Sequence, residues 1–183
     1  MASDGKWVLG SSALLASDRI SIVLFPLSAA PHAETQARAV ASKPGYNLWQ
    51  GRFSPDGRWI CFNAIKRVGV TGSTLYVVPT SGGEWVQITE ENAWADKPRW
   101  SPDGRTIYFL SSRAGFLNVW GRRFDPARGQ PVGEPFQVTS FENPGRRVWE
   151  NIAGGELSVS KDRLVLCIAN ATGSIWMLEG VDR

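Results

Sequence analysis

The sequence has few of the residues that most active sites use: among 183 residues there are two cysteines and a single histidine. Two cysteines are too few for a disulfide-stapled miniprotein, and they do not form a Cys-x-x-Cys redox or zinc motif. No Gly-x-Ser-x-Gly elbow accompanies His32, and no phosphate-binding or dinucleotide-binding glycine loop occurs. We therefore expect no enzyme activity, no catalytic residue, no metal and no cofactor.

Long apolar runs and a strong charge excess are also missing. The nearest candidate for a membrane span, residues 20–30, contains Pro26 and is shorter than the roughly 20 residues that a membrane helix needs, so a strand is the better interpretation. Basic residues exceed acidic residues by only 20 to 17, and they form scattered pairs. Nucleic acid would require a longer basic stripe, so we expect no nucleic-acid partner and no membrane contact by this segment.

Tryptophan, glycine and proline are abundant instead, with 9, 19 and 11 copies, which favours short strands separated by tight turns. A repeat supports this pattern, because residues 52–62 match residues 99–109 at an offset of 47. A weaker copy covers residues 3–9 and a degenerate one residues 160–166. A period near 50 with strand-forming segments is typical of a propeller blade rather than of a helical solenoid.

The shared core of the repeat, Ser-Pro-Asp-Gly, predicts a hairpin turn. Proline sets φ at the second position, aspartate tolerates the third, and glycine can adopt the left-handed conformation at the fourth. Strand-forming residues follow directly, as in Trp59-Ile60-Cys61-Phe62. In the degenerate copy Lys161 replaces proline, and either the glycine is deleted or Arg163 occupies its place.

Each repeat unit is expected to hold four antiparallel strands, called A to D, with the turn between A and B. The fold class is therefore all-β, with about four β-propeller blades spanning residues 1–43, 44–91, 92–141 and 142–183. The first copy lacks strand A and the last lacks strand D. We expect a segment of a larger propeller of six to eight blades, in which open blade edges would otherwise drive association.

Large aromatic and sulfur-bearing residues are expected in the core between blades. The tryptophans assigned to this role are Trp7, Trp59, Trp85, Trp100, Trp120 and Trp176. Cys61 and Cys167 each follow the turn aspartate by five residues, so both should be buried, free and poorly reactive in strand B. Their blades would be too far apart for a disulfide.

The aromatic-Ser-Pro-Asp-Gly-Arg motif followed by Ile-x-Phe resembles the WD40-like (PD40) repeat of TolB-type propellers. The resemblance covers nearly the whole chain, and it implies a binding scaffold in which the motif residues are structural. Residues 118–125 look most like the C-terminal sensor propellers of bacterial transmembrane Ser/Thr kinases and regulators. Residues 1–15 lack a signal peptide, but the resemblance favours a periplasmic or extracytoplasmic location within a longer bacterial protein, with a cytoplasmic location as the alternative.

The best candidate for a binding surface is the set of loops between strand D of one blade and strand A of the next, because such loops converge at one face. These loops are residues 42–49, 90–97 and 140–149. Their aromatic, arginine and acidic residues are the candidate site: Tyr46, Trp49, Trp94, Asp96, Arg146, Arg147 and Trp149. Aromatic and arginine side chains commonly anchor interfaces, although each of these tryptophans could instead cap the core.

These sequence features favour two functions. The first is a non-enzymatic module that binds a protein or small molecule as the sensor or interaction part of a larger bacterial protein. The second is an accessory propeller that gates substrates for a serine peptidase of the prolyl-oligopeptidase type. A carboxylate-based enzyme is a weaker alternative, resting on three acidic residues near the starts of inner strands, which are Asp96, Glu142 and Glu150.

Overall fold

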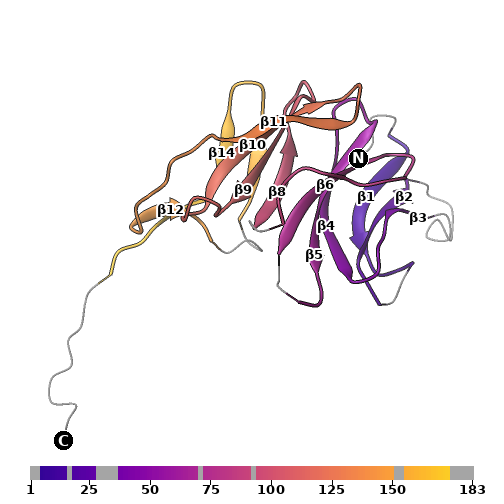
Figure 1. The fold of residues 1–183 in the computed structure, drawn as a ribbon, viewed down its shortest axis with the longest axis horizontal. Coiled ribbons are helices and arrows are strands. Elements are labelled where there is room, and N and C mark those ends of the chain that lie inside the picture. The colour runs from indigo at the N-terminus through magenta and orange to yellow at the C-terminus, as the bar shows by residue number, and fades with distance from the viewer. Residues whose placement is uncertain are drawn as a thin grey trace, which may run out of the picture.

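The computed structural model describes residues 5–15, 18–27, 37–69, 72–91, 94–150 and 155–173, and this part of the chain contains only strands, turns and loops. The sheets stand side by side and are connected in chain order (Figure 1). The all-β propeller-blade architecture is therefore confirmed. Trp176 and His32 lie outside the described residues.

Two complete four-stranded antiparallel sheets form the centre of the molecule. In chain order these are the second sheet, with the strand order β4-β5-β6-β7, and the third sheet, which runs from β8 to β11 with β8 and β11 at its edges. The strands are β4 (Tyr46–Phe53), β5 (Trp59–Lys66), β6 (Ser73–Pro79), β7 (Val86–Gln87), β8 (Ala95–Trp100), β9 (Thr106–Ser111), β10 (Asn118–Asp125) and β11 (Gln130–Gln137). β4 and β8 are strand A of their blades, because the Ser-Pro-Asp-Gly turn follows each of them.

The outer repeats contribute less complete sheets. The first sheet lies before β4 and has three strands. Its first strand follows the first turn of the repeat and occupies one edge. Its strands are β1 (Trp7–Ser12), β2 (Ser21–Pro26) and β3 (Arg38–Ala41). After β11, two short strand pairs make one interrupted hairpin, in which β12 pairs with β15 and β13 with β14. These strands are β12 (Arg146–Val148), β13 (Leu157–Val159), β14 (Leu164–Leu166) and β15 (Ile168–Asn170).

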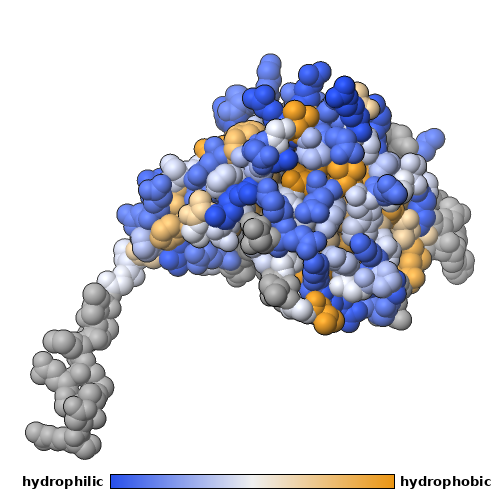
Figure 2. Space-filling view, in the orientation of Figure 1, coloured by the Kyte–Doolittle hydropathy of each residue, from blue (hydrophilic) through white to orange (hydrophobic). Residues whose placement is uncertain are grey.

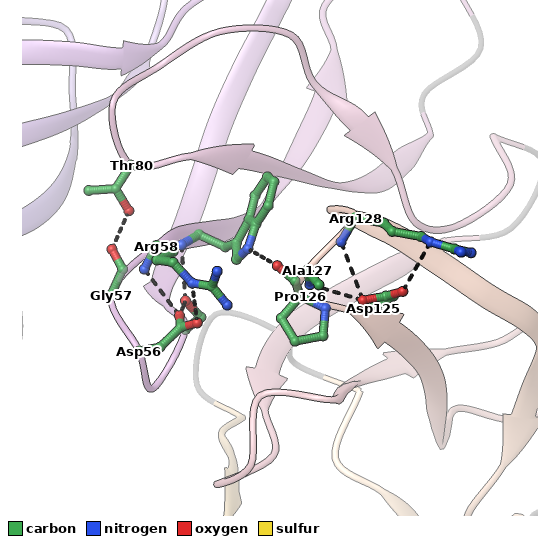
Figure 3. Close-up of polar contacts among 10 residues, drawn as sticks. Asp56, Gly57, Arg58, Thr80, Asp125, Pro126, Ala127 and Arg128 are labelled. Atoms are coloured by element: carbon green, nitrogen blue, oxygen red, sulfur yellow. Dashed lines mark hydrogen bonds and ion pairs between the residues drawn. The ribbon is translucent and has the colours of Figure 1, made fainter.

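The turn chemistry is the same in both strong repeats. The Ser54 hydroxyl donates to Asp56 Oδ1 at 2.6 Å and accepts from the Trp59 amide at 3.0 Å. Asp56 also accepts from the Arg58 amide, as Figure 3 shows. Ser101 and Asp103 repeat this arrangement. The Ser101 hydrogen bond lowers the pKa of the Asp103 carboxyl, which therefore stays ionised as an acceptor at neutral pH.

The fourth repeat has a tighter turn, and this corrects the alignment of the cysteines. The Ser160 amide donates to the carbonyl of Arg163 at 2.8 Å, whereas the Ser54 amide reaches Trp59, two residues farther along. Both the glycine and the following arginine are thus deleted, so Val165 is the equivalent of Cys61. The expectation that Cys167 is a buried strand-B residue is wrong: it is exposed, between β14 and β15.

The two thiols are free, as expected, but they should differ sharply in reactivity. Burial raises the pKa of the Cys61 thiol to about 12, so almost none of it is thiolate at pH 8, whereas Cys167 is accessible. Ellman's reagent at pH 8 should label one thiol per native chain and two in guanidinium. Cys167→Ser should abolish the native signal; a native signal that persists in this variant would contradict the assignment.

In the part of the chain that the structure describes, the hydrophobic core consists of three clusters, each between neighbouring sheets. Alternate residues of β5 point to opposite sides, since Ile60 and Phe62 pack against the first sheet while Cys61 packs against the third. A third cluster joins Val119 to Leu157 of the last hairpin. The five described tryptophans assigned to the core all lie in or against the first two clusters, as predicted: Trp7, Trp59, Trp85, Trp100 and Trp120.

A polar contact at the A–B turn end links the two central blades. The indole N–H of Trp59 donates to the carbonyl of Pro126 at 3.1 Å, in the loop that joins β10 to β11 (Figure 3). Gly129 lies against the same ring, where an added Cβ would come within 2.2 Å of Trp59 Cη2. Trp59 and the β10–β11 loop therefore determine how closely the two blades pack.

Candidate functional site

The candidate residues lie mainly on inner strands rather than in loops. The strand-A segments begin earlier than expected: β4 contains Tyr46 and Trp49, β8 contains Asp96, and β12 contains Arg146 and Arg147. Trp94 immediately precedes β8, and Trp149 immediately follows β12. The loops between blades are correspondingly shorter than the sequence suggested.

Strand register shows that three candidate residues occupy the same place in successive blades. Trp49 pairs with Asn63, and Asp96 pairs with Leu110 at the equivalent point of β9. In the last hairpin the Trp149 amide donates to the Cys167 carbonyl at 2.9 Å, which places Trp149 at this level too. The inner strands thus present one row of equivalent positions, Trp49, Asp96 and Trp149, which we call the inner row.

The inner row differs in exposure from blade to blade. Trp49 and Trp149 are 39% and 45% exposed, so neither indole is buried in the core. Asp96 is buried, and burial raises the pKa of its carboxyl, while the Lys97 amide donates to it at 2.6 Å and opposes the shift. The two exposed indoles are therefore the members of the row that can contact a partner directly.

The other candidates divide into accessible and structural residues. Arg147 lines a cavity of about 200 Å³ together with Trp149, Glu150 and Ala169, and it pairs with Glu150 at 3.6 Å. Arg146 is exposed on the same strand.

Tyr46 and Trp94 are more involved in packing. The Tyr46 ring packs edge-on against Trp85 at 6.3 Å, and the ammonium of Lys43 lies 5.2 Å from its centroid. Trp94 is half-buried, and its indole lies close enough to Asp96 to help lower the pKa of that carboxyl against the effect of burial. We expect both residues to support the site rather than to form its contact surface.

Just beyond the inner row, both complete inner strands are bulged. Gln50 and Lys97 hold equivalent left-handed conformations, with φ of 55° and 53°, at the register shifts of β4 and β8. Non-glycine residues rarely adopt this region, so the surrounding structure, rather than the preference of Gln50 or Lys97, holds the bulge in strand A. In the last hairpin, seven residues (150–156) separate Trp149 from Leu157. In β4 a single residue, Gln50, separates the equivalent positions Trp49 and Gly51.

A charged cluster follows the bulge, and no motif in the sequence predicted it. The ammonium of Lys97 lies 3.4 Å from Glu156 Oε1, and the Arg99 guanidinium donates to Glu156 Oε2. Burial lowers the pKa of Arg99, as does the nearby charge of Arg52. Two cations of β8 thus converge on one carboxylate that precedes β13.

Arg52, on β4 of the second sheet, adds a third positive charge near this cluster. Among the described residues, its guanidinium donates to the carbonyl of Gly51 at 3.1 Å, and no carboxylate forms an ion pair with it. Arg52 also lines a cavity of about 380 Å³ with Leu9, Gly51 and Phe53. A signal for the cluster was present in the repeat, because Arg52 and Arg99 occupy the same position before the aromatic-Ser-Pro-Asp-Gly motif.

The acidic residues considered for catalysis are not brought together. Asp96 is buried in β8, whereas Glu142 and Glu150 are exposed in the connections around β12. Within the described ranges no group of three or more histidine, cysteine or acidic residues is placed to hold a metal ion. The same part of the chain includes no helix with the length and apolar character needed to cross a membrane.

Comparisons with curated proteins find similarity over part of the chain, and no protein-family model matches it. An uncharacterized protein of Agrobacterium fabrum, Atu1656, is 35% identical over 101 residues, which are 55% of this chain and 32% of that protein. The uncharacterized peptidase YuxL of Bacillus subtilis is 43% identical over 56 residues, 31% of this chain and 8% of the peptidase. The aligned part thus spans a third or less of either relative.

Solved structures agree on the fold. A structure assigned as TolB from Agrobacterium tumefaciens matches 93% of this chain and 59% of its own, with a TM-score of 0.63 and 21% identity. TolB from Acinetobacter baumannii matches 91% of this chain and 39% of its own, with a TM-score of 0.58 and 20% identity. A puromycin hydrolase matches 85% of this chain and 26% of its own, with a TM-score of 0.59 and 18% identity. The chain therefore has a TolB-like β-propeller fold, which structures of a puromycin hydrolase and of prolyl endopeptidases also contain.

Proposed function

We propose that this chain is a non-enzymatic binding module, the sensor or interaction part of a larger bacterial propeller protein. The observation that carries the proposal is the inner row, in which Trp49 and Trp149 remain exposed at equivalent positions two blades apart. Exposed tryptophan beside arginine is typical of the anchors of protein interfaces. The cavity between Arg147 and Trp149 gives a partner side chain a place to insert.

The face of the molecule drawn in Figure 2 suits a partner of mixed polarity. Figure 2 shows polar residues over most of this view, with apolar residues in small patches among them. A surface of this kind supports reversible binding better than it supports an obligate interface, which is more apolar. We therefore favour a peptide or protein loop as the partner, with a small molecule as the alternative. A periplasmic or extracytoplasmic location remains part of the proposal, supported by the TolB-like fold.

Alanine at Trp49 and Trp149 should weaken selective peptide binding without unfolding the domain. A displayed random-peptide library would be panned on the wild-type chain, and the affinities of enriched peptides measured by calorimetry. We expect the double variant to weaken binding at least tenfold, about 1.4 kcal/mol or more, because truncating an interface anchor typically costs this much. The melting temperature should change by only a few degrees.

Val68→Ala is the control for truncating an exposed apolar side chain, because Val68 is 85% exposed in the loop after β5 and is not part of the inner row. It should leave both affinity and melting temperature unchanged. Peptides that bind the double variant as tightly as the wild-type chain would place the binding surface elsewhere. A library that yields no binder at all would refute the peptide-binding role.

A second function is supported by the similarity to peptidases. The Bacillus subtilis relative is described as a peptidase, and the puromycin hydrolase has the same propeller fold over most of this chain. In this alternative the propeller gates substrates for a serine peptidase domain. A Gly-x-Ser-x-Gly elbow encoded in the same polypeptide would favour it, whereas a transmembrane segment and kinase domain would favour the sensor role. The kinase-sensor resemblance and association through open blade edges stay predictions.

A further inference from the structure

The three core clusters between blades share one pattern. In each cluster, the residue five positions after one turn aspartate lies with the residue four positions after the next, once the two-residue deletion in the last repeat is counted. The pairs are Leu9 with Ile60, Cys61 with Ile107, and Tyr108 with Leu164. Each blade therefore has a downstream face, which carries the first residue of such a pair, and an upstream face, which carries the second.

This series has an open position at each end. Val165 is the equivalent of Cys61 on the downstream face of the last hairpin, and it is 63% exposed. Val8 is the equivalent of Ile60 and Ile107 on the upstream face of the first sheet, and it is 40% exposed. In the central blades all of these positions are fully buried. Figure 1 shows the first sheet and the last hairpin at opposite ends of the row of sheets.

The upstream face around Val8 is apolar. Val8 pairs with Phe25 on β2, so the two side chains lie on the same face. The Phe25 ring also lies over Gly10, where an added Cβ would come within 3.1 Å of it. The central blades carry a buried phenylalanine, Phe62 or Phe109, at the position of Gly10. The first sheet thus keeps, through Phe25, the aromatic surface that a central blade presents to its neighbour.

The downstream face around Val165 is also suited to close approach. Val165 pairs with Ser158 on β13, whose small side chain leaves room beside the valine. Leu164 and Leu166, on either side of Val165, point the other way and pack against the third cluster. The exposed valine is therefore not needed by the core of the hairpin to which it belongs.

We propose that the downstream face around Val165 docks on the upstream face around Val8 of a second copy of this chain. The contact continues the series of blade contacts head to tail, because the open position of one copy has the register of the open position of the other. It uses the faces of sheets, so it differs from association through the hydrogen-bonding edges of blades. It is also independent of the proposed binding role, since Trp49 stays 39% exposed although a blade follows it.

Sedimentation velocity over a wide range of concentrations tests this contact. The wild-type chain should associate reversibly, and Val165→Asp or Val8→Asp alone should raise the dissociation constant at least tenfold, because each places a charge against an apolar face. An equimolar mixture of the two variants should regain a complex with one copy of each, since together they retain one intact pair of faces. Mixing cannot restore an interface that uses the same patch on both copies.

Val132→Asp is the matched control, because Val132 is 48% exposed on the edge strand β11 and belongs to neither terminal face. It should leave association unchanged, whereas loss of association in this variant would assign the contact to strand edges. Circular dichroism and thermal melting establish that each variant is folded. Where an aspartate variant unfolds, threonine at the same position keeps the shape of valine and should weaken association in the same direction.

A cysteine pair tests the register directly. Val8→Cys and Val165→Cys, each in a Cys167→Ser chain, should form a disulfide with one another under mild oxidation faster than either forms one with itself, since Cys61 is buried. A wild-type chain that stays monomeric would assign both faces to further blades of a longer polypeptide and overturn the proposal. Failure of mixing to restore association, or disulfides that preferentially join identical positions, would overturn it as well.

Discussion

Gly129→Ala should lower the free energy of unfolding by about 2–5 kcal/mol, one of the two largest effects expected for a single substitution in this chain. Gly129 has a φ of +69°, so an added Cβ first costs the strain of the left-handed region. That Cβ would also come within 2.2 Å of the Trp59 ring, whose indole is held by the Pro126 carbonyl. The ring can yield only by breaking the contact between the two central blades.

Gly133 supplies a closely matched control. It has a φ of +65° in the neighbouring strand β11, but nothing lies within 4 Å of the position of its Cβ. Gly133→Ala should therefore cost only the backbone strain, about 1–2 kcal/mol. Urea denaturation, monitored by fluorescence, measures the free energy of unfolding of both variants. In a Trp59→Ala background, the costs of the two glycine substitutions should converge. Equal costs in the wild-type background would show that Trp59 does not restrict Gly129.

The second large effect is expected at the centre of the core between the first two sheets. Phe62 is fully buried, and its ring packs edge-on against Trp85 with a centroid distance of 5.0 Å. Phe62→Ala should destabilise the fold by about 3–5 kcal/mol, because it removes apolar contacts and leaves a cavity between blades. Chemical denaturation should show a lower midpoint with little change in slope.

Phe136 provides the comparison for this substitution. It lies on β11 and is 39% exposed, so Phe136→Ala should cost about 1 kcal/mol or less. Phe62→Leu should recover most of the stability lost in Phe62→Ala, since it refills much of the volume. If Phe62→Ala and Phe136→Ala were equally mild, the cluster between the first two sheets would not be the stabilising core.

The repeat motif predicted the blades well because turn chemistry is local. The Ser-Pro-Asp-Gly sequence contains its own hydrogen-bond donors and acceptors, and in both strong copies the serine and aspartate bond within the turn. Where the motif degenerates, the local signal fails. The two-residue deletion after Asp162 cannot be located from residue counts, so counting five residues from Asp162 gives Cys167 the wrong register and does not predict its exposure.

By itself, the sequence determined the all-β class, the order of the strands and the tryptophans that pack the core, because alternating apolar residues and turn motifs act over a few residues. Only the tertiary structure decided which residues of neighbouring blades meet. The inner row and the contacts of Arg52, Lys97, Arg99 and Glu156 depend on the register between inner strands and on the bulges at Gln50 and Lys97. Such contacts join residues up to 59 positions apart, and no local pattern specifies their distance.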